Sequence, residues 1–163
     1  MKREPLLYRR LSLTDLPNLL DIMLDAKHMA YSTHFKNKQQ CETYLQMLAS
    51  QWQTLGFGCW TILEKSSNAT IGWGGIMIDE NDPGWGPELI YYISPEYCGR
   101  GYASQLASTA LQFAFDELDL PKVAAFAHPD NIASQKVLAK AGFEFCAYLE
   151  DMNRNYYEAR SDV

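Results

Sequence analysis

Residues 98–104 combine residue types that bind an anion through the backbone. They read Cys-Gly-Arg-Gly-Tyr-Ala-Ser and lie between a strand-like and a helix-like segment. Gly99 and Gly101 let the backbone approach a ligand closely, and the first-turn amides of a helix have no partner within that helix. Together these features predict a phosphate-binding loop at the start of a helix. The alternative is that the two glycines only form a tight turn.

Two common phosphate-binding motifs do not fit this segment. A dinucleotide-binding fingerprint would have a third glycine where Ser104 stands, and an acidic residue at the end of the next strand, where residues 128–130 read His-Pro-Asp. A P-loop lysine followed by serine or threonine is also absent. We therefore disfavour a Rossmann or nucleotide triphosphatase fold.

Apolar periodicity indicates the elements that position this loop. Leucines and methionines at three- and four-residue steps predict a helix over about 14–26, and a second apolar stripe predicts a helix that ends at Gly56. Strands are predicted over 6–9, 57–64, 70–78 and 88–94. They are followed by a helix over 102–118, a strand over 123–127, a helix over 132–141, and strands over 143–148 and 156–160. This order predicts one mixed α/β domain over residues 1–163, with a parallel strand pair inside a mostly antiparallel sheet.

The composition favours a neutral or cationic substrate. With 14 basic and 20 acidic side chains the formal charge is −6, which disfavours a nucleic acid or an anionic membrane as the main partner. The four cysteines lie far apart without metal-ligand spacing, so we expect no metal site and no disulfide framework. A charged start and the lack of a long apolar run predict a cytoplasmic protein. The sequence is compatible with a monomer or a dimer.

Two motifs together resemble the GNAT acyltransferase superfamily. Residues 99–103, Gly-Arg-Gly-Tyr-Ala, resemble its acetyl-CoA pyrophosphate loop. Residues 131–143, Asn-Ile-Ala-Ser-Gln-Lys-Val-Leu-Ala-Lys-Ala-Gly-Phe, look like its second signature, in the form seen in the RimJ/RimL branch of ribosomal-protein acetyltransferases. The resemblance covers essentially the whole chain. It implies the GNAT fold, a twisted, mostly antiparallel sheet with one splayed parallel strand pair, flanked by about four helices.

The resemblance also implies that acetyl-CoA is the co-substrate. The residues that it assigns to coenzyme binding are Ile93, Ser94, Gly99, Arg100, Gly101, Tyr102, Ala103, Ser104, Asn131 and Ser134. Two positions depart from the family pattern. Cys98 stands where the loop usually begins with Arg or Gln, and we interpret it as a small space-filling residue rather than a reactive thiol. Leu138 stands where many members carry a tyrosine thought to protonate the departing coenzyme.

Ser134 is our candidate for assisting the leaving group. A thiol with a pKa of about 8.5 lies about 1.5 units above neutral pH, so its protonation contributes at most roughly 2 kcal/mol. The Ser134 hydroxyl, in the first turn of the last helix, could hold the thiolate or relay a proton through water. The alternative is an ordinary contact at a helix N-terminus, where Asn131 is expected both to cap the helix and to contact the coenzyme.

Glu88 is our candidate general base. A lysine-like amine with a pKa of about 10.4 costs over 4 kcal/mol to deprotonate at pH 7, so a base acting through water is expected. Strand alternation places Glu88 on one face with Ile90 and Tyr92. Alternatively, Glu88 is a solvated acid and Tyr92 donates a hydrogen bond, although core packing is our interpretation of Tyr92. Structural or acceptor-loop roles are assigned to His28, His34 and His128.

In the resembled fold, a bulge near Ile93 and Ser94 splays their strand from the strand 123–127. The pantetheine arm lies between the two strands and pairs with the backbone. One freed amide at Ile93 or Ser94 is then expected to stabilise the oxyanion, a type of contact worth about 3 to 4 kcal/mol. Because no nucleophile–base pair is visible, we expect direct attack by the amine.

We therefore expect an enzyme that moves acetyl from acetyl-CoA to a primary amine, on a protein N-terminus or a small molecule. The acceptor site is expected to be formed by residues 31–35, 79–86 and 151–157. The acids that could make its mouth negative, if they are not simply solvated surface, are Asp79, Glu80, Asp82, Glu150 and Asp151. The alternative function is a catalytically silent coenzyme A-binding or regulatory module, for which Cys98 and Leu138 are the motivating departures.

Overall fold

A computed structural model describes residues 5–162; residues 1–4, which belong to the charged start, and Val163 lie outside the described residues. Seven strands form one sheet in the order β1-β2-β3-β4-β5-β7-β6. Neighbouring strands are antiparallel except β4 and β5, which run parallel. The strands are β1 (Leu6–Arg10), β2 (Cys59–Glu64), β3 (Thr70–Met77), β4 (Glu88–Ile93), β5 (Lys122–Ala127), β6 (Glu144–Leu149) and β7 (Arg154–Arg160).

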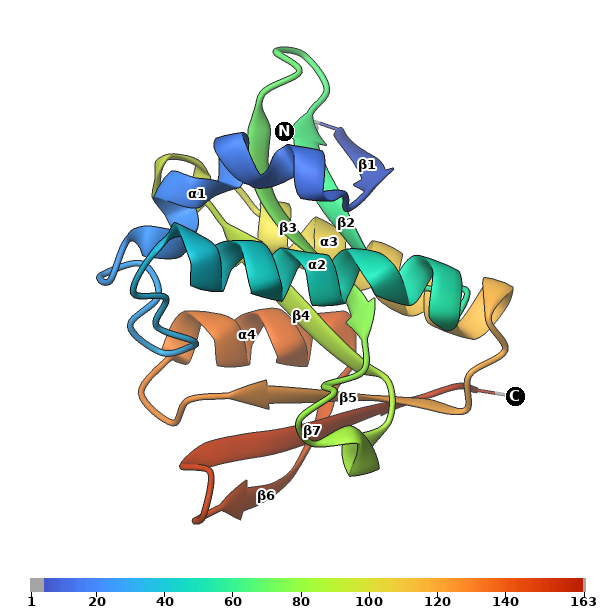
Figure 1. The fold of residues 1–163 in the computed structure, drawn as a ribbon. Helices are drawn as coiled ribbons and strands as arrows, with labels where there is room; N and C mark the ends of the chain where they lie inside the picture. The colour runs from blue at the N-terminus through green and yellow to red at the C-terminus, as the bar shows by residue number, and fades with distance from the viewer. Residues whose placement is uncertain (1–4, 163) are drawn as a thin grey trace.

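Helices cover both faces of this sheet because successive strand side chains alternate between two apolar faces. On one face Trp73 packs with α1 (Leu16–Leu24) and α2 (Lys38–Thr54). On the other face Leu106 of α3 (Tyr102–Gln112) and Leu138 of α4 (Ile132–Ala141) are buried. Figure 1 shows α1 and α2 on the viewer's side of the sheet and α3 behind it. The predicted mixed α/β fold, with four helices and one parallel strand pair, is confirmed.

The element boundaries differ from the predicted ones where local hydrogen bonds decide them. Ser12 caps the first helical turn by accepting the backbone N–H of Thr14, and Asp15 completes this capping box. α3 ends earlier than predicted, and the chain continues in a π-helical turn, Phe113–Glu117. β7 begins at Arg154, two residues before the predicted strand, because that residue pairs with Leu149 across the final hairpin.

Gly72 fixes the distance between β3 and β4. A Cβ atom at this position would collide with the carbonyl oxygen of Tyr92 on the neighbouring strand. No side chain therefore fits there, which accounts for a glycine inside a buried strand. This close approach holds β4 in place directly before a 3₁₀ turn, Pro95–Tyr97, leads to α3.

β4 and β5 pair at one position, where Glu88 lies opposite Ala124. The backbone N–H of Ala124 donates to the carbonyl of Pro87 at 2.9 Å. Beyond this point the two strands diverge, and α4 lies behind the gap between their ribbons (Figure 1). We call the edge of β4 that faces β5 over residues 91–93 the splayed edge. In the described part of the chain, no helix is long and apolar enough to cross a bilayer.

Candidate active site

The backbone groups of β4 alternate between β3 and the splayed edge. The N–H of Ser94 donates to the carbonyl of Ile71 at 2.7 Å, so this pair continues the ladder with β3. In an antiparallel ladder the backbone groups of alternate residues point to opposite sides, so those of Tyr91 and Ile93 point toward the splayed edge. Of the two amides expected to stabilise an oxyanion, that of Ser94 is therefore used within the sheet, and that of Ile93 points toward the site.

The bulge expected near Ile93 and Ser94 is not what separates the two strands. The register between β3 and β4 runs without a shift from Glu88 opposite Met77 to Ile93 opposite Gly72. The hydrogen bond from Ser94 continues that register. The edge is exposed because β5 turns away after its single pairing position, which leaves the geometry of β4 regular.

The predicted phosphate-binding loop follows the splayed edge. Gly99 and Gly101 both have φ of +80°, a conformation that glycine adopts without strain. Gly101 occupies the N-cap position of α3, and no side chain caps this helix. A diphosphate fits here because its oxygens can accept hydrogen bonds from first-turn amides, to which Ala103 and Ser104 belong.

Arg100 and Tyr102 tie this loop to β2 through one carboxylate. The Tyr102 hydroxyl donates to Glu64 at 2.6 Å, and an Arg100 nitrogen lies 3.6 Å from the same carboxylate. These interactions, the tyrosine hydrogen bond first, lower the pKa of Glu64. Because the Tyr102 side chain is buried, any contact of this residue with a diphosphate is through its backbone, whereas half of the Arg100 side chain is exposed.

Cys98 contacts the end of β4 through its side chain. Its Sγ lies 3.6 Å from the carbonyl oxygen of Ile93 and 3.5 Å from that of Ser94, which joins the loop to the end of β4. Burial raises the pKa of the Cys98 thiol, the opposite of the shift that a reactive thiolate requires. The contacts therefore favour the space-filling interpretation.

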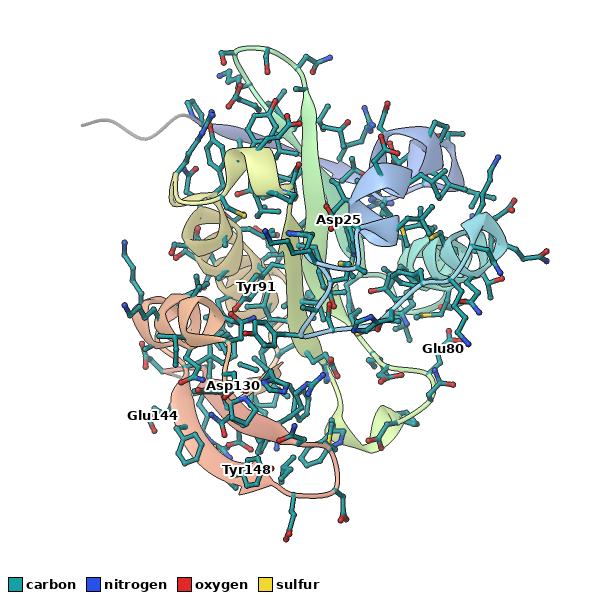
Figure 2. The ribbon with its side chains drawn as sticks, turned by 90° about the vertical axis from the view of Figure 1, so that its left-hand side faces the viewer. Asp25, Glu80, Tyr91, Asp130, Glu144 and Tyr148 are labelled. Carbon is teal, nitrogen blue, oxygen red and sulfur yellow. The ribbon has the colours of Figure 1, made fainter. Side chains whose placement is uncertain are left out.

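The start of α4 contacts a residue that sequence reasoning missed. Asn131 caps the helix by accepting the backbone N–H of Ser134 at 3.2 Å. The Ser134 hydroxyl lies 2.6 Å from the hydroxyl of Tyr91, whose oxygen is also 3.2 Å from the Ser134 carbonyl oxygen. Figure 2 shows Tyr91 near the end of α4 that follows Asp130. Burial raises the pKa of Tyr91 to about 12, so its hydroxyl stays protonated.

Glu88 lies on the opposite face of β4 from Tyr91. It shares this face with Tyr92, which stacks on Trp73 at 4.5 Å between ring centroids, and core packing is therefore the role that the structure shows for Tyr92. Burial, and then the charges of Asp79 and Asp82, raise the pKa of Glu88 to about 7. A carboxylate with this pKa can accept a proton near neutral pH. Three residues of strand, about 10 Å, separate Glu88 from Tyr91.

Contacts of Trp85 and Arg154 bring the predicted acceptor segments to the face of the sheet that carries Glu88. Trp85 donates to Asp82 at 2.9 Å and packs on Phe126 and Tyr156, so the loop between β3 and β4 lies over β5 and β7. An Arg154 nitrogen donates to the carbonyl of Tyr31 at 3.0 Å, which joins the loop before α2 to β7.

The remaining predicted acids and histidines have different surroundings. Asp79 and Asp82 act on Glu88, whereas Glu150 and Asp151 lie in the turn between β6 and β7. The ring of His128 packs against Tyr31 at 4.9 Å, which places it among the acceptor segments. Among residues 5–162, no group of three or more His, Cys, Asp or Glu side chains is arranged to hold a metal ion.

Comparisons with known proteins agree with this geometry. A family model described as an acetyltransferase (GNAT) domain matches residues 6–144. The protein YkkB of Bacillus subtilis is 26% identical over 139 residues, which cover 84% of this chain and 81% of that protein. An acetyltransferase from Agrobacterium tumefaciens has a TM-score of 0.83 at 23% identity, covering 99% of this chain and 94% of that one. RimL, a ribosomal α-N-protein acetyltransferase solved with coenzyme A, has a TM-score of 0.78 at 17% identity, covering 99% of both chains. The chain belongs to the GNAT acetyltransferase family.

Proposed function

We propose that this chain transfers the acetyl group of acetyl-CoA to a primary amine by direct attack. The observation that carries the proposal is the splayed edge, where backbone groups of Tyr91 and Ile93 point away from β3 and toward the side that β5 leaves. It lies directly before a helix that begins without a side-chain cap. An extended thioester arm fits the first feature, and its diphosphate fits the second. The family and the coenzyme A complex of RimL support this choice of donor.

Coenzyme binding is assigned mainly to the backbone. The amides of Gly99, Arg100, Gly101, Tyr102, Ala103 and Ser104 surround the position for the diphosphate. The splayed edge, which ends at Ile93, pairs with the pantetheine arm, and Ser94 holds the end of β4 in register through its bond to Ile71. Asn131 fixes the first turn of α4, where Ser134 meets the thioester end.

Glu88 accepts the proton that the amine must lose, through water. A base of pKa about 7 is matched to this task because it is ionised at working pH and still basic enough to take a proton. The N–H of Ile93 stabilises the oxyanion as the nitrogen–carbon bond forms. The carbon–sulfur bond then breaks with its electron pair on sulfur, and the Ser134 hydroxyl donates a hydrogen bond to that sulfur. Neither Glu88 nor Ser134 forms a covalent bond to the acyl group.

The acceptor is a primary amine that is cationic in solution. Asp79, Asp82 and Glu88 place negative charge on the acceptor face, which attracts a cation. The likeness to RimL suggests a protein N-terminus, and a small-molecule amine is the other class. A cytoplasmic location agrees with the four cysteines, all of which are free thiols.

The test measures coenzyme A binding by calorimetry, and then acetyl transfer to a panel of N-terminal peptides, polyamines and amino acids by mass shift and thiol release. We expect saturable coenzyme binding and turnover with at least one amine. Absence of coenzyme binding would exclude the assignment. Tight binding without turnover on any acceptor would support the silent module that Leu138 suggests, because that side chain is fully buried in the core.

A further inference from the structure

Arg154, the first residue of β7, is a half-buried cation that pairs with no acid of the described chain. One terminal nitrogen of its guanidinium donates to the carbonyl of Tyr31 at 3.0 Å, and the other donates to the carbonyl of Asn153 at 2.9 Å. Within residues 5–162 it forms no ion pair, whereas Arg160, on the same strand, pairs with Glu158 at 2.7 Å. The two bonds use two of its five N–H groups. The guanidinium is therefore held in place while its charge is left for a ligand.

The sheet register places Arg154 on the face that carries Glu88. Glu88 lies opposite Ala124, which lies opposite Glu158, and the side chains of directly opposed residues share a face. Arg154 is four residues from Glu158, so alternation along β7 puts both side chains on that face. These four residues run in the same direction as the four that lead from Glu88 to Tyr92, because β4 is parallel and β7 antiparallel to β5. Arg154 therefore lies at the level of Tyr92, where the strands are splayed.

Opposite charges act together on the Tyr92 hydroxyl. Burial raises the pKa of this phenol, and a hydrogen bond with Ser32 lowers it. Of the weaker influences on this pKa, the charge of Glu88 raises it and the charge of Arg154 lowers it. Charges shift a pKa mainly over short distances, so the carboxylate and the guanidinium both lie near one aromatic side chain. Glu88, like Arg154, forms no ion pair within the described residues. The acceptor face therefore offers a ligand an acid and a separate guanidinium.

This arrangement matches an acceptor that carries both charges. A guanidinium presents its N–H groups in a planar fork whose geometry fits a carboxylate. In a protein N-terminus the neighbouring carboxylate has become an amide, and a polyamine would add a second cation beside Arg154. Either ligand would cover the half-buried charge of Arg154 without pairing it, which costs free energy. A free amino acid instead brings its ammonium group to the acids and its carboxylate to the arginine.

We propose that Arg154 binds a carboxylate of the acceptor, and that the substrate is an amine with a free carboxylate on the neighbouring carbon, as in a free amino acid. The inference rests on the proposed function, which places the acetyl donor at the splayed edge and the base at Glu88. Arg154 acts by binding alone. The amine nitrogen still attacks the thioester carbon, its proton still passes through water to Glu88, and sulfur still keeps the electron pair of the broken bond.

The first test compares substrates that differ in one group. Amino acids with small, apolar, aromatic and basic side chains are each assayed beside their carboxamides, which keep the α-amine and lose the negative charge. For at least one side chain we expect kcat/KM for the free acid to exceed that for its carboxamide about thirtyfold. A neighbouring carboxylate raises the pKa of an ammonium group, so the free acid is the more protonated amine and its preference cannot come from amine reactivity. Carboxamides turned over as well as every free acid would overturn the inference.

The second test assigns the preference to Arg154. Arg154→Gln should reduce the ratio of the two kcat/KM values from about thirtyfold to about one, and Arg154→Lys, which keeps the charge without the fork, should give an intermediate ratio. The matched control is Arg160→Gln, which removes a guanidinium from the same strand and should leave the ratio unchanged. A purely structural role through the contact with Tyr31 would slow both substrates equally. An unchanged ratio in Arg154→Gln or, if that variant does not fold, in Arg154→Lys would overturn the role of Arg154.

These outcomes differ from a failure of the proposed function. Turnover of carboxamides and N-terminal peptides without any preference for free acids would support an acetyltransferase and overturn only the carboxylate site. Lack of coenzyme A binding, or binding without turnover of any amine, would exclude the proposed function itself.

Discussion

The two sides of β4, proposed to bind the acetyl donor and the acceptor amine, are formed by different parts of the chain. In the proposed function, the donor side uses backbone from one continuous segment, the end of β4 and the loop with Gly99 and Gly101, together with the first turn of α4. The proposed acceptor side uses side chains from loops far apart in sequence, joined by contacts such as those of Trp85 and Arg154. A backbone site depends little on side-chain identity, whereas a side-chain site can change its substrate by substitution. The difference predicts a fixed donor and a variable acceptor.

The largest effect is expected from Glu88→Gln, which removes the proposed base from the acceptor side. At pH 8 the kcat/KM for the amine should fall about a hundredfold. Because the pKa of Glu88 is raised to about 7, the wild-type profile should rise through that value. The variant should lose this rise and approach wild type only near the amine pKa of about 10.4. The control is Glu80→Gln, which changes an exposed acid in the loop between β3 and β4. An unchanged pH profile in Glu88→Gln would exclude Glu88 as the base.

Glu88→Gln should also stabilise the fold above neutral pH. The pKa of Glu88 is raised from 4.5 to about 7, so the folded state disfavours its charged form. The resulting destabilisation is absent below pH 4.5, develops between 4.5 and 7, and is complete above 7. We expect the variant's free energy of unfolding in urea to exceed that of wild type by about 3 kcal/mol at pH 8 and to match it at pH 4. A variant less stable at pH 8 would instead indicate a structural acid.

A smaller effect is expected on the donor side from Gly99→Val. Gly99 has φ of +80° with open space around its Cβ position, and Gly56 has φ of +79° with equally open space at the end of α2. Valine in this conformation costs about 1 to 3 kcal/mol. Both substitutions should lower the melting temperature by a similar amount. Gly99→Val should also weaken coenzyme A binding about tenfold in calorimetry, whereas Gly56→Val should leave the affinity for coenzyme A unchanged. Equal affinities in the two variants would exclude the backbone cradle.

The difference between features formed within one short segment and features formed by distant segments explains what could be predicted from the sequence. The element order, the parallel pair and the loop around Gly99 follow from patterns within short segments. The contact between Tyr91 and Ser134 joins residues 43 positions apart and depends on the angle at which β4 passes α4. The bulge expected near Ile93 was wrong because two strands can diverge without any insertion in their ladder. Strand alternation alone could have placed Tyr91 on the face opposite Glu88. It could not have identified Ser134 as the residue that Tyr91 contacts.

The smallest effect separates acids that act on the base from acids that only line the surface. Asp82→Asn removes a charge that raises the pKa of Glu88 and keeps an oxygen that can accept from Trp85. The rising limb of the kcat/KM profile should move to lower pH by about half a unit, because a like charge no longer opposes ionisation. Asp151→Asn, in the turn between β6 and β7, should leave the limb in place. If both substitutions moved the limb equally, the acids would act on Glu88 through the overall charge of the acceptor face. The charge of Asp82 in the loop before β4 would then have no particular effect on the pKa of Glu88.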